Sequence, residues 1–93
     1  MHVYSIIIEL RLPSDTLKGK RGIVKSILAR ARNRFNVAAA EVDDQDVPGY
    51  AVLGFVTVTE GRAQGRRILE QVEDMIVDER PDVEVVLADI EER

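Results

Sequence analysis

The chain has 93 residues, of which 45% are hydrophobic and 32% are charged, as is typical of one small globular domain with a single core. Cysteine is absent, which excludes disulfides, thiolate nucleophiles and thiolate metal sites. The apolar segments are too short to span a membrane, and the first residues lack the pattern of a signal peptide. We therefore expect a cytoplasmic protein with no membrane contact, in which residues 1–93 form a single domain.

Charge is distributed very unevenly along the chain. The sequence carries 13 basic and 17 acidic residues, for a formal net charge of −4. Residues 16–40 contain seven of the basic residues and no Asp or Glu, so this stretch carries +7 and the remainder −11. The seven are Lys18, Lys20, Arg21, Lys25, Arg30, Arg32 and Arg34. A local positive field of this kind can attract a polyanion to a protein that is acidic overall.

Hydrophobic periodicity predicts six elements in the order βαββαβ. Strands are predicted over residues 3–12, 36–43, 50–59 and 82–90, and helices over residues 17–34 and 61–79. Pro13 ends the first strand and Pro81 follows the second helix. Residues 44–49 are polar and contain a Pro-Gly turn signal, and so short a connection favours an antiparallel pair of strands.

This order of elements predicts an α+β, ferredoxin-like fold, with both helices on one face of a four-stranded antiparallel sheet. Right-handed crossovers then give the strand order 4-1-3-2. One parity of the first strand is expected to face the core, namely Tyr4, Ile6, Ile8 and Leu10. The opposite face of the sheet has no helix to cover it, and its expected occupants include Val3, Ile7, Leu53, Phe55 and Thr57. Because this face is partly apolar, we expect a homodimer, formed through it or through an edge strand.

The basic residues of the first helix form a pattern suited to binding phosphates. At about 100° per residue, Lys18, Arg21, Lys25 and Arg32 lie on one flank of the apolar stripe, and Arg30 and Arg34 on the other. No acid interrupts the helix, so several phosphates of one RNA backbone could be contacted together. The alternative is a solvated helix face whose cations pair with acids elsewhere in the chain. The candidate RNA-binding residues are Lys18, Lys20, Arg21, Lys25, Arg32 and Arg34.

Two other nucleic-acid signals are weaker. Gly19-Lys20-Arg21-Gly22 has the spacing of the GxxG loop of KH domains, but that loop joins two helices, whereas a strand and Pro13 precede this motif. RRM domains stack bases on several aromatic side chains, and here Phe55 is the one aromatic residue expected to face outward from a central strand. Phe55 is therefore interpreted as a dimer or core contact.

The sequence offers little for catalysis or metal binding. The acidic run Glu41, Asp43, Asp44 and Asp46 does not fit an EF-hand loop, because Pro48 stands where a ligand is required, and a solvated turn is expected instead. His2 is the only histidine, and no nucleophile, base and orienting group can be assembled around it. We therefore expect a protein that is not an enzyme and that has no metal and no cofactor.

Several blocks in order along the chain resemble the YlxP-like family of small bacterial proteins. These blocks are Leu17-Lys18-x-Lys20-Arg21, Val24-Lys25-Ser26, Asn33-Arg34-Phe35-Asn36-Val37, Ala40-Glu41-Val42 with Gln45-Asp46, and Ala51-Val52-Leu53-Gly54. Gly19 and Gly22 depart from the family, which commonly has charged residues at both positions, and Thr16 thereby lacks the Glu of a capping box.

The resemblance implies a ferredoxin-like fold. It also implies a ribosome-binding role, because the family's members are often encoded beside translation and ribosome-maturation factors. It implies no catalytic residue. We therefore expect a non-catalytic module that binds RNA or a ribosomal subunit. The alternative is a dimeric regulatory module that binds a small molecule or another protein.

Overall fold

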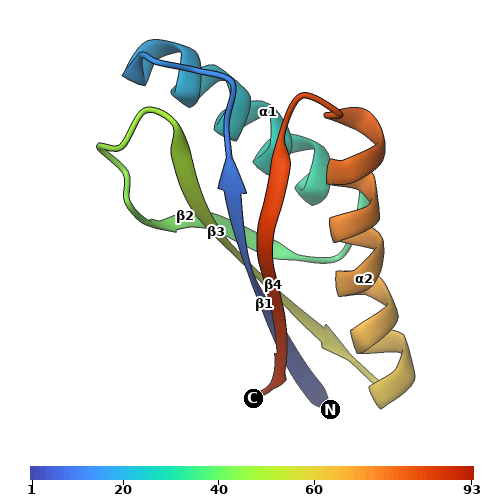
Figure 1. Ribbon diagram of the computed structural model, residues 1–93. Helices are drawn as coiled ribbons and strands as arrows, with labels where there is room; N and C mark the ends of the chain where they lie inside the picture. The colour runs from blue at the N-terminus through green and yellow to red at the C-terminus, as the bar shows by residue number, and fades with distance from the viewer.

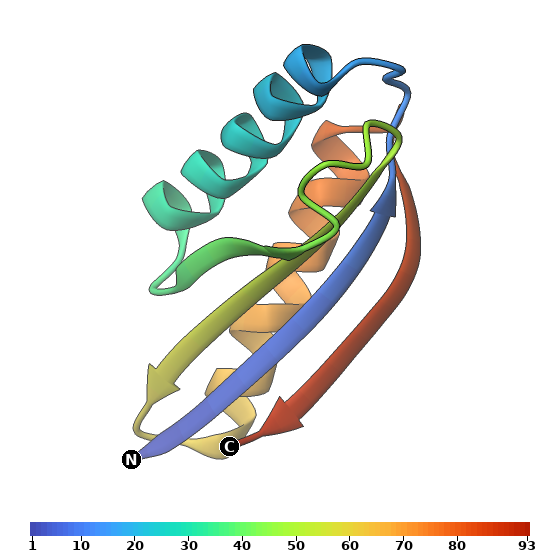
Figure 2. The ribbon, with the colours of Figure 1, turned by 90° about the vertical axis from the view of Figure 1, so that its left-hand side faces the viewer.

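The computed structural model describes residues 1–93 and confirms the predicted ferredoxin-like fold. The elements are β1 (His2–Arg11), α1 (Leu17–Arg34), β2 (Ala38–Asp43), β3 (Tyr50–Thr59), α2 (Arg62–Glu79) and β4 (Glu84–Glu92). The sheet is antiparallel with the order β2-β3-β1-β4, and both helices lie on one face of it (Figure 1, Figure 2). The bounds of α1 and β3 agree with the prediction, and the other elements shift by one or two residues. β2 and β4 are the two edge strands.

The core lies between the sheet and the helices. As predicted, β1 contributes Tyr4, Ile6, Ile8 and Leu10 to it. From the helices come Val24, Ile27, Leu28, Ala31, Leu69, Val72, Met75 and Ile76. α2 packs against β1 and β3, whereas α1 packs mainly against β2. The remaining side chains of α1 are thus held beside the β2 edge of the sheet.

The predicted orientation of β3 is wrong. Leu53, Phe55 and Thr57 are buried under the helices, and they pair in register with Ile8, Ile6 and Tyr4 of the core-facing side of β1. Both alternating sets of β3 are apolar, so the pattern by itself does not select the set that faces inward. The face of the sheet opposite the helices instead receives Val52, Gly54, Val56 and Val58 from this strand. Of the residues predicted for that face, Val3 and Ile7 remain there, both partly exposed.

The start of α1 explains one of its two glycines. Thr16 is the N-cap, and its hydroxyl accepts a hydrogen bond of 3.1 Å from the backbone N–H of Gly19. A Cβ on Gly19 would lie only 2.6 Å from the Ser14 hydroxyl, so a larger residue would disturb this cap. Gly22 also lies inside α1, and the GxxG motif is therefore part of a helix rather than a KH-type loop.

The hydrogen bond between Tyr50 and Glu9 should make the stability of the fold depend on pH. The Tyr50 hydroxyl donates to Glu9 Oε1 at 2.5 Å, and this bond raises the pKa of Tyr50 above its usual 10.0. The folded state thus favours the neutral phenol, and the resulting stabilisation is complete below pH 10 and is lost as the pH rises through the raised pKa. We expect Glu9→Gln to lower the pKa of Tyr50, measured by tyrosinate absorbance with Tyr50→Phe identifying the transition. A Tyr50 titration unchanged by Glu9→Gln would contradict this assignment.

Candidate nucleic-acid interface

Six of the seven basic side chains of α1 fall into two groups on opposite sides of its buried stripe. Arg30 and Arg34 reach across to α2, where both form ion pairs with Glu79. The Arg30 Nη1 to Glu79 Oε1 distance is 3.0 Å. One carboxylate therefore serves two guanidinium groups, and this flank of α1 is tied to α2. Arg34, a predicted RNA contact, already has a partner in the protein.

The other flank of α1 carries cations with few internal partners. Lys18, Arg21 and Lys25 are exposed and make no ion pair or side-chain hydrogen bond. Arg32 lies on the same flank and donates from Nη2 to the carbonyl oxygen of Ala39 at 2.5 Å. Because Ala39 belongs to β2, this contact shows that the flank faces the free edge of the sheet. We call Lys18, Arg21, Lys25 and Arg32 the basic flank.

The basic flank is long enough to meet several phosphates. At a rise of 1.5 Å per residue, the 14 residue steps from Lys18 to Arg32 span about 21 Å of helix. α1 contains no acidic residue, so nothing on the helix itself neutralises these charges. The helix itself therefore carries only positive side-chain charges, although the whole protein carries −4.

The position of Lys18 and Arg21 is unfavourable for the helix. Both lie in the first turns of α1, which contain no acid, and cations at a helix N-terminus oppose the helix dipole. Each such cation costs about 0.3–1 kcal/mol at low ionic strength. Helix stability thus does not account for the basic residues at this end of α1. With an anion bound beside them, these two cations would stabilise the protein instead of destabilising it.

Lys20 does not belong to the predicted site. Its side chain is 1% exposed, and Nζ donates hydrogen bonds to the carbonyl oxygens of Asp44 (2.6 Å) and Val47 (2.8 Å). Nζ also lies 2.9 Å from Glu41 Oε2, an ion pair in which that oxygen receives no well-directed hydrogen bond. These acceptors enclose the ammonium group, so it cannot reach a phosphate. We correct the predicted site by removing Lys20.

The sequence did contain a signal for the burial of Lys20. Lys20 is four, seven and eleven residues before Val24, Ile27 and Ala31, and all three are buried. Lys20 therefore lies on the core stripe of α1 and not on the basic flank. The acceptor that completes the pair, Glu41, lies on the core side of β2 because it pairs with Leu53. Glu41 was predicted to belong to a solvated turn, but its Oε2 is buried beside Lys20.

The remaining functional predictions concern metals and membranes. No group of three or more His, Cys, Asp or Glu side chains is close enough to hold a metal ion. Neither α1 nor α2 combines the length and the apolar character needed to cross a lipid bilayer.

Comparison with known proteins gives a family but no activity. Residues 3–90 match the model of a family described as protein of unknown function, DUF503. An uncharacterised protein of Bacillus subtilis (strain 168), YlxP, is 35% identical over 71 residues, which are 76% of each chain.

Two solved structures share the fold at low sequence identity. One, from Chloroflexus aurantiacus J-10-fl, is described as a candidate antibiotic biosynthesis monooxygenase; it is 17% identical, with a TM-score of 0.58 over 96% of this chain and 90% of that one. The other is a de novo designed protein with a ferredoxin fold, LFR1 1; it is 14% identical, with a TM-score of 0.63 over 100% of this chain and 84% of that one. At these identities the likeness shows the fold alone.

Proposed function

Because the chain belongs to the DUF503 family of proteins of unknown function, we propose its function from its surface chemistry. It is a non-catalytic module that binds structured RNA through the basic flank. The observation that carries this proposal is the absence of internal partners for Lys18, Arg21 and Lys25. The other basic residues of α1 all have partners within the protein.

The proposed recognition is of RNA shape and backbone more than of base sequence. Lysine and arginine side chains along one flank suit phosphate oxygens, which position a protein on RNA without reading its bases. An aromatic platform for base stacking is lacking, since Tyr4 and Phe55 are buried in the core. Phe35 packs against the core, and Tyr50 is partly buried with its hydroxyl bonded to Glu9. Ribosomal RNA is the first target to test, because the large ribosomal RNAs present dense, folded phosphate surfaces. The acidic remainder of the chain would repel RNA from the other faces and so orient the complex.

The test is the salt dependence of RNA binding. In the wild-type protein, log K should fall linearly with log salt by about 0.7–0.9 for each phosphate contacted. The triple variant Lys18→Ala, Arg21→Ala, Lys25→Ala should bind ribosomal subunits and folded RNA more weakly, with a slope smaller by about two to three contacts. Filter binding or fluorescence anisotropy over a salt series measures this slope.

A charge-matched control separates a binding surface from a general effect of charge. The triple variant Arg11→Ala, Arg30→Ala, Arg34→Ala also removes three positive charges, but each of these residues is ion-paired in the protein. We expect this control to keep the wild-type salt slope. Equal slopes for the two triple variants, or no RNA bound by the wild type at low salt, would contradict the proposal. The basic flank would then be a solvated face or a site for an acidic protein.

A further inference from the structure

The face of the sheet opposite the helices is apolar over β2, β3 and part of β1. Ile7, Ala38, Ala40, Val42, Gly54, Val56 and Val58 make up this apolar area, which we call the open face. Three of its valines are strongly exposed: Val42 (51%), Val56 (39%) and Val58 (47%). The neighbouring strand β4 contributes acids to the same side of the sheet, namely Asp89 and Glu91, which pair with Ile7 and Ser5. The apolar area therefore has a polar rim on one side.

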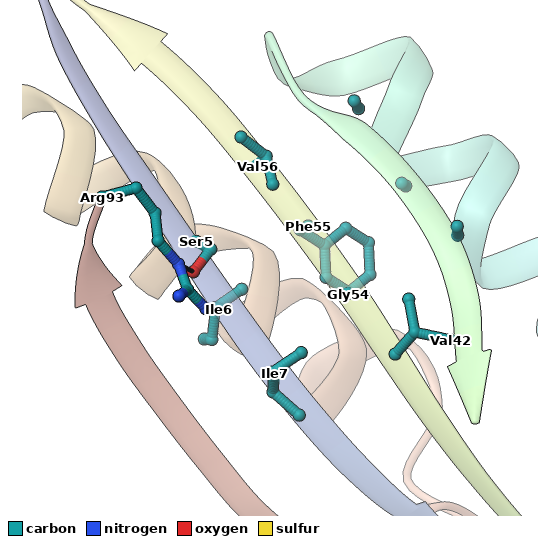
Figure 3. A pocket seen from close by; sticks show the side chains of 11 residues that line it. Ser5, Ile6, Ile7, Val42, Gly54, Phe55, Val56 and Arg93 are labelled. Atoms are coloured by element: carbon teal, nitrogen blue, oxygen red, sulfur yellow. Dashed lines mark hydrogen bonds between the residues drawn. The ribbon is translucent and has the colours of Figure 1, made fainter. Parts of the chain in front are cut away.

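A hollow of about 340 Å³ lies within the open face, over Gly54 (Figure 3). Gly54 stands between Ala40 of β2 and Ile7 of β1 at the floor of the hollow. Val42 lies against it, since a Cβ on Gly54 would be 3.0 Å from Val42 Cγ1. Figure 3 shows Ile7, Val42 and Val56 around Gly54. A glycine weakens the interior of a strand and often marks a place where another chain approaches closely. The hollow is lined by residues of β1, β2 and β3, and the exposed Val56 of β3 stands at its side.

We infer that the open face binds a second copy of this chain, with an apolar side chain of each copy placed in the hollow of the other. A two-fold interface must be complementary to itself, and an open face that carries both a hollow and projecting valines meets this condition. The polar rim formed by Asp89 and Glu91 would remain in contact with solvent. Such an arrangement, apolar in the middle and polar at the edge, is that of stable protein interfaces.

The size of this side of the sheet agrees with a dimer. The molecule measures 41 × 22 × 20 Å along its principal axes. One side that runs the full length of the molecule has an outline on the order of 800 Å² when the polar rim is included, which is what each partner buries in a standard interface. A small ligand seated in the hollow would leave Val58 and much of Val42 exposed to water. A second copy covers both.

The one charged side chain at the hollow does not call for an anionic ligand. Arg93 lies at one end, where its Nε donates to the Ser5 hydroxyl at 2.7 Å. Its Nη2 is 3.2 Å from Glu91 Oε2, so the guanidinium group is already paired. The remaining lining is mostly apolar. Charge thus favours an apolar occupant such as the valines of another copy.

The inferred dimer is compatible with the basic flank. α1 and the open face lie on opposite sides of the sheet (Figure 2), so dimerisation leaves both basic flanks exposed. A dimer would then present two RNA-binding surfaces, and linked binding events strengthen each other. The inferred dimer does not depend on RNA binding, because its mass is measured on the protein alone.

Analytical ultracentrifugation at tens of micromolar tests the inference. We expect the wild-type mass to be twice the 10.4 kDa of the single chain. Val56→Lys and Val58→Lys each place a charge in the apolar interface and should halve the mass. Both side chains are exposed in the single chain, so the fold should persist, as circular dichroism would confirm.

Two matched controls locate the interface. Val77→Lys introduces the same change on α2, at a side chain that is 50% exposed on the other side of the sheet, and should leave the dimer intact. Val86→Lys introduces the same change on the edge strand β4, where the side chain is 43% exposed, and should also leave the dimer intact. A wild-type mass of one chain, dissociation by Val77→Lys equal to that by Val56→Lys, or dissociation by Val86→Lys alone would overturn the inference.

Discussion

Replacing Lys20 with Met is expected to lower the free energy of unfolding by about 3–5 kcal/mol, the usual effect of breaking a buried ion pair by removing one partner. The variant leaves Glu41 Oε2, an oxygen sealed from solvent, without its counter-charge. It also removes one of the two hydrogen-bond donors to each of the carbonyl oxygens of Asp44 and Val47. Since a domain of this size is stable by about 5–15 kcal/mol, the loss would be a large part of the total. Urea denaturation followed by circular dichroism measures it.

Two further variants test the cause of this loss. Lys18→Met alters an exposed lysine two residues away in the same helix and should not destabilise the protein, because removing a cation from the helix N-terminus stabilises it by up to about 1 kcal/mol. The double variant Lys20→Met, Glu41→Leu removes the stranded carboxylate and should recover part of the loss, because replacing both partners of a buried pair by apolar groups is often close to neutral. If Lys18→Met were as destabilising as Lys20→Met, the buried ammonium group would not be the cause.

Replacing Gly65 with Ala is expected to lower the free energy of unfolding by about 1–3 kcal/mol, the range found for overpacked cores. Alanine normally stabilises a helix interior by about 1 kcal/mol relative to glycine. At this position, however, a Cβ would lie 2.6 Å from Tyr4 Cδ2 and 2.9 Å from the Thr59 hydroxyl. Both neighbours are buried between α2 and the sheet, so neither can move away cheaply.

The matched variant is Gly22→Ala in α1. A Cβ at Gly22 would have no atom within 4 Å, so the normal helix preference should prevail and stabilise the protein by about 1 kcal/mol. Thermal unfolding of the two variants should thus give shifts of opposite sign. Shifts of the same sign would mean that Tyr4 and Thr59 can move to accommodate the added Cβ without loss of stability.

The sequence by itself determined the order and the type of the elements, and their bounds to within two residues. α1 begins after Thr16 because that residue caps it, and its length follows from apolar residues at helical spacing. The strand order followed from the right-handedness of the two crossovers, which is a general property of L-amino acids. The separation of the basic residues of α1 into two flanks followed from the helical period. These features depend on local chemistry, which a sequence displays directly.

Tertiary structure alone decided which face of β3 is buried and which cations are free. Both sets of side chains on β3 are apolar, and only its register with β1 turned Phe55 inward and left Val56 and Gly54 on the open face. Arg34 is occupied because Glu79, 45 residues later, lies beside it once α2 is packed. Lys20 is buried because Glu41 and the loop carbonyls surround it. Partners distant in the sequence neutralise a charge only after folding brings them together. The helical period therefore predicted the members of the basic flank, but it could not predict that Lys20 and Arg34 have partners within the protein.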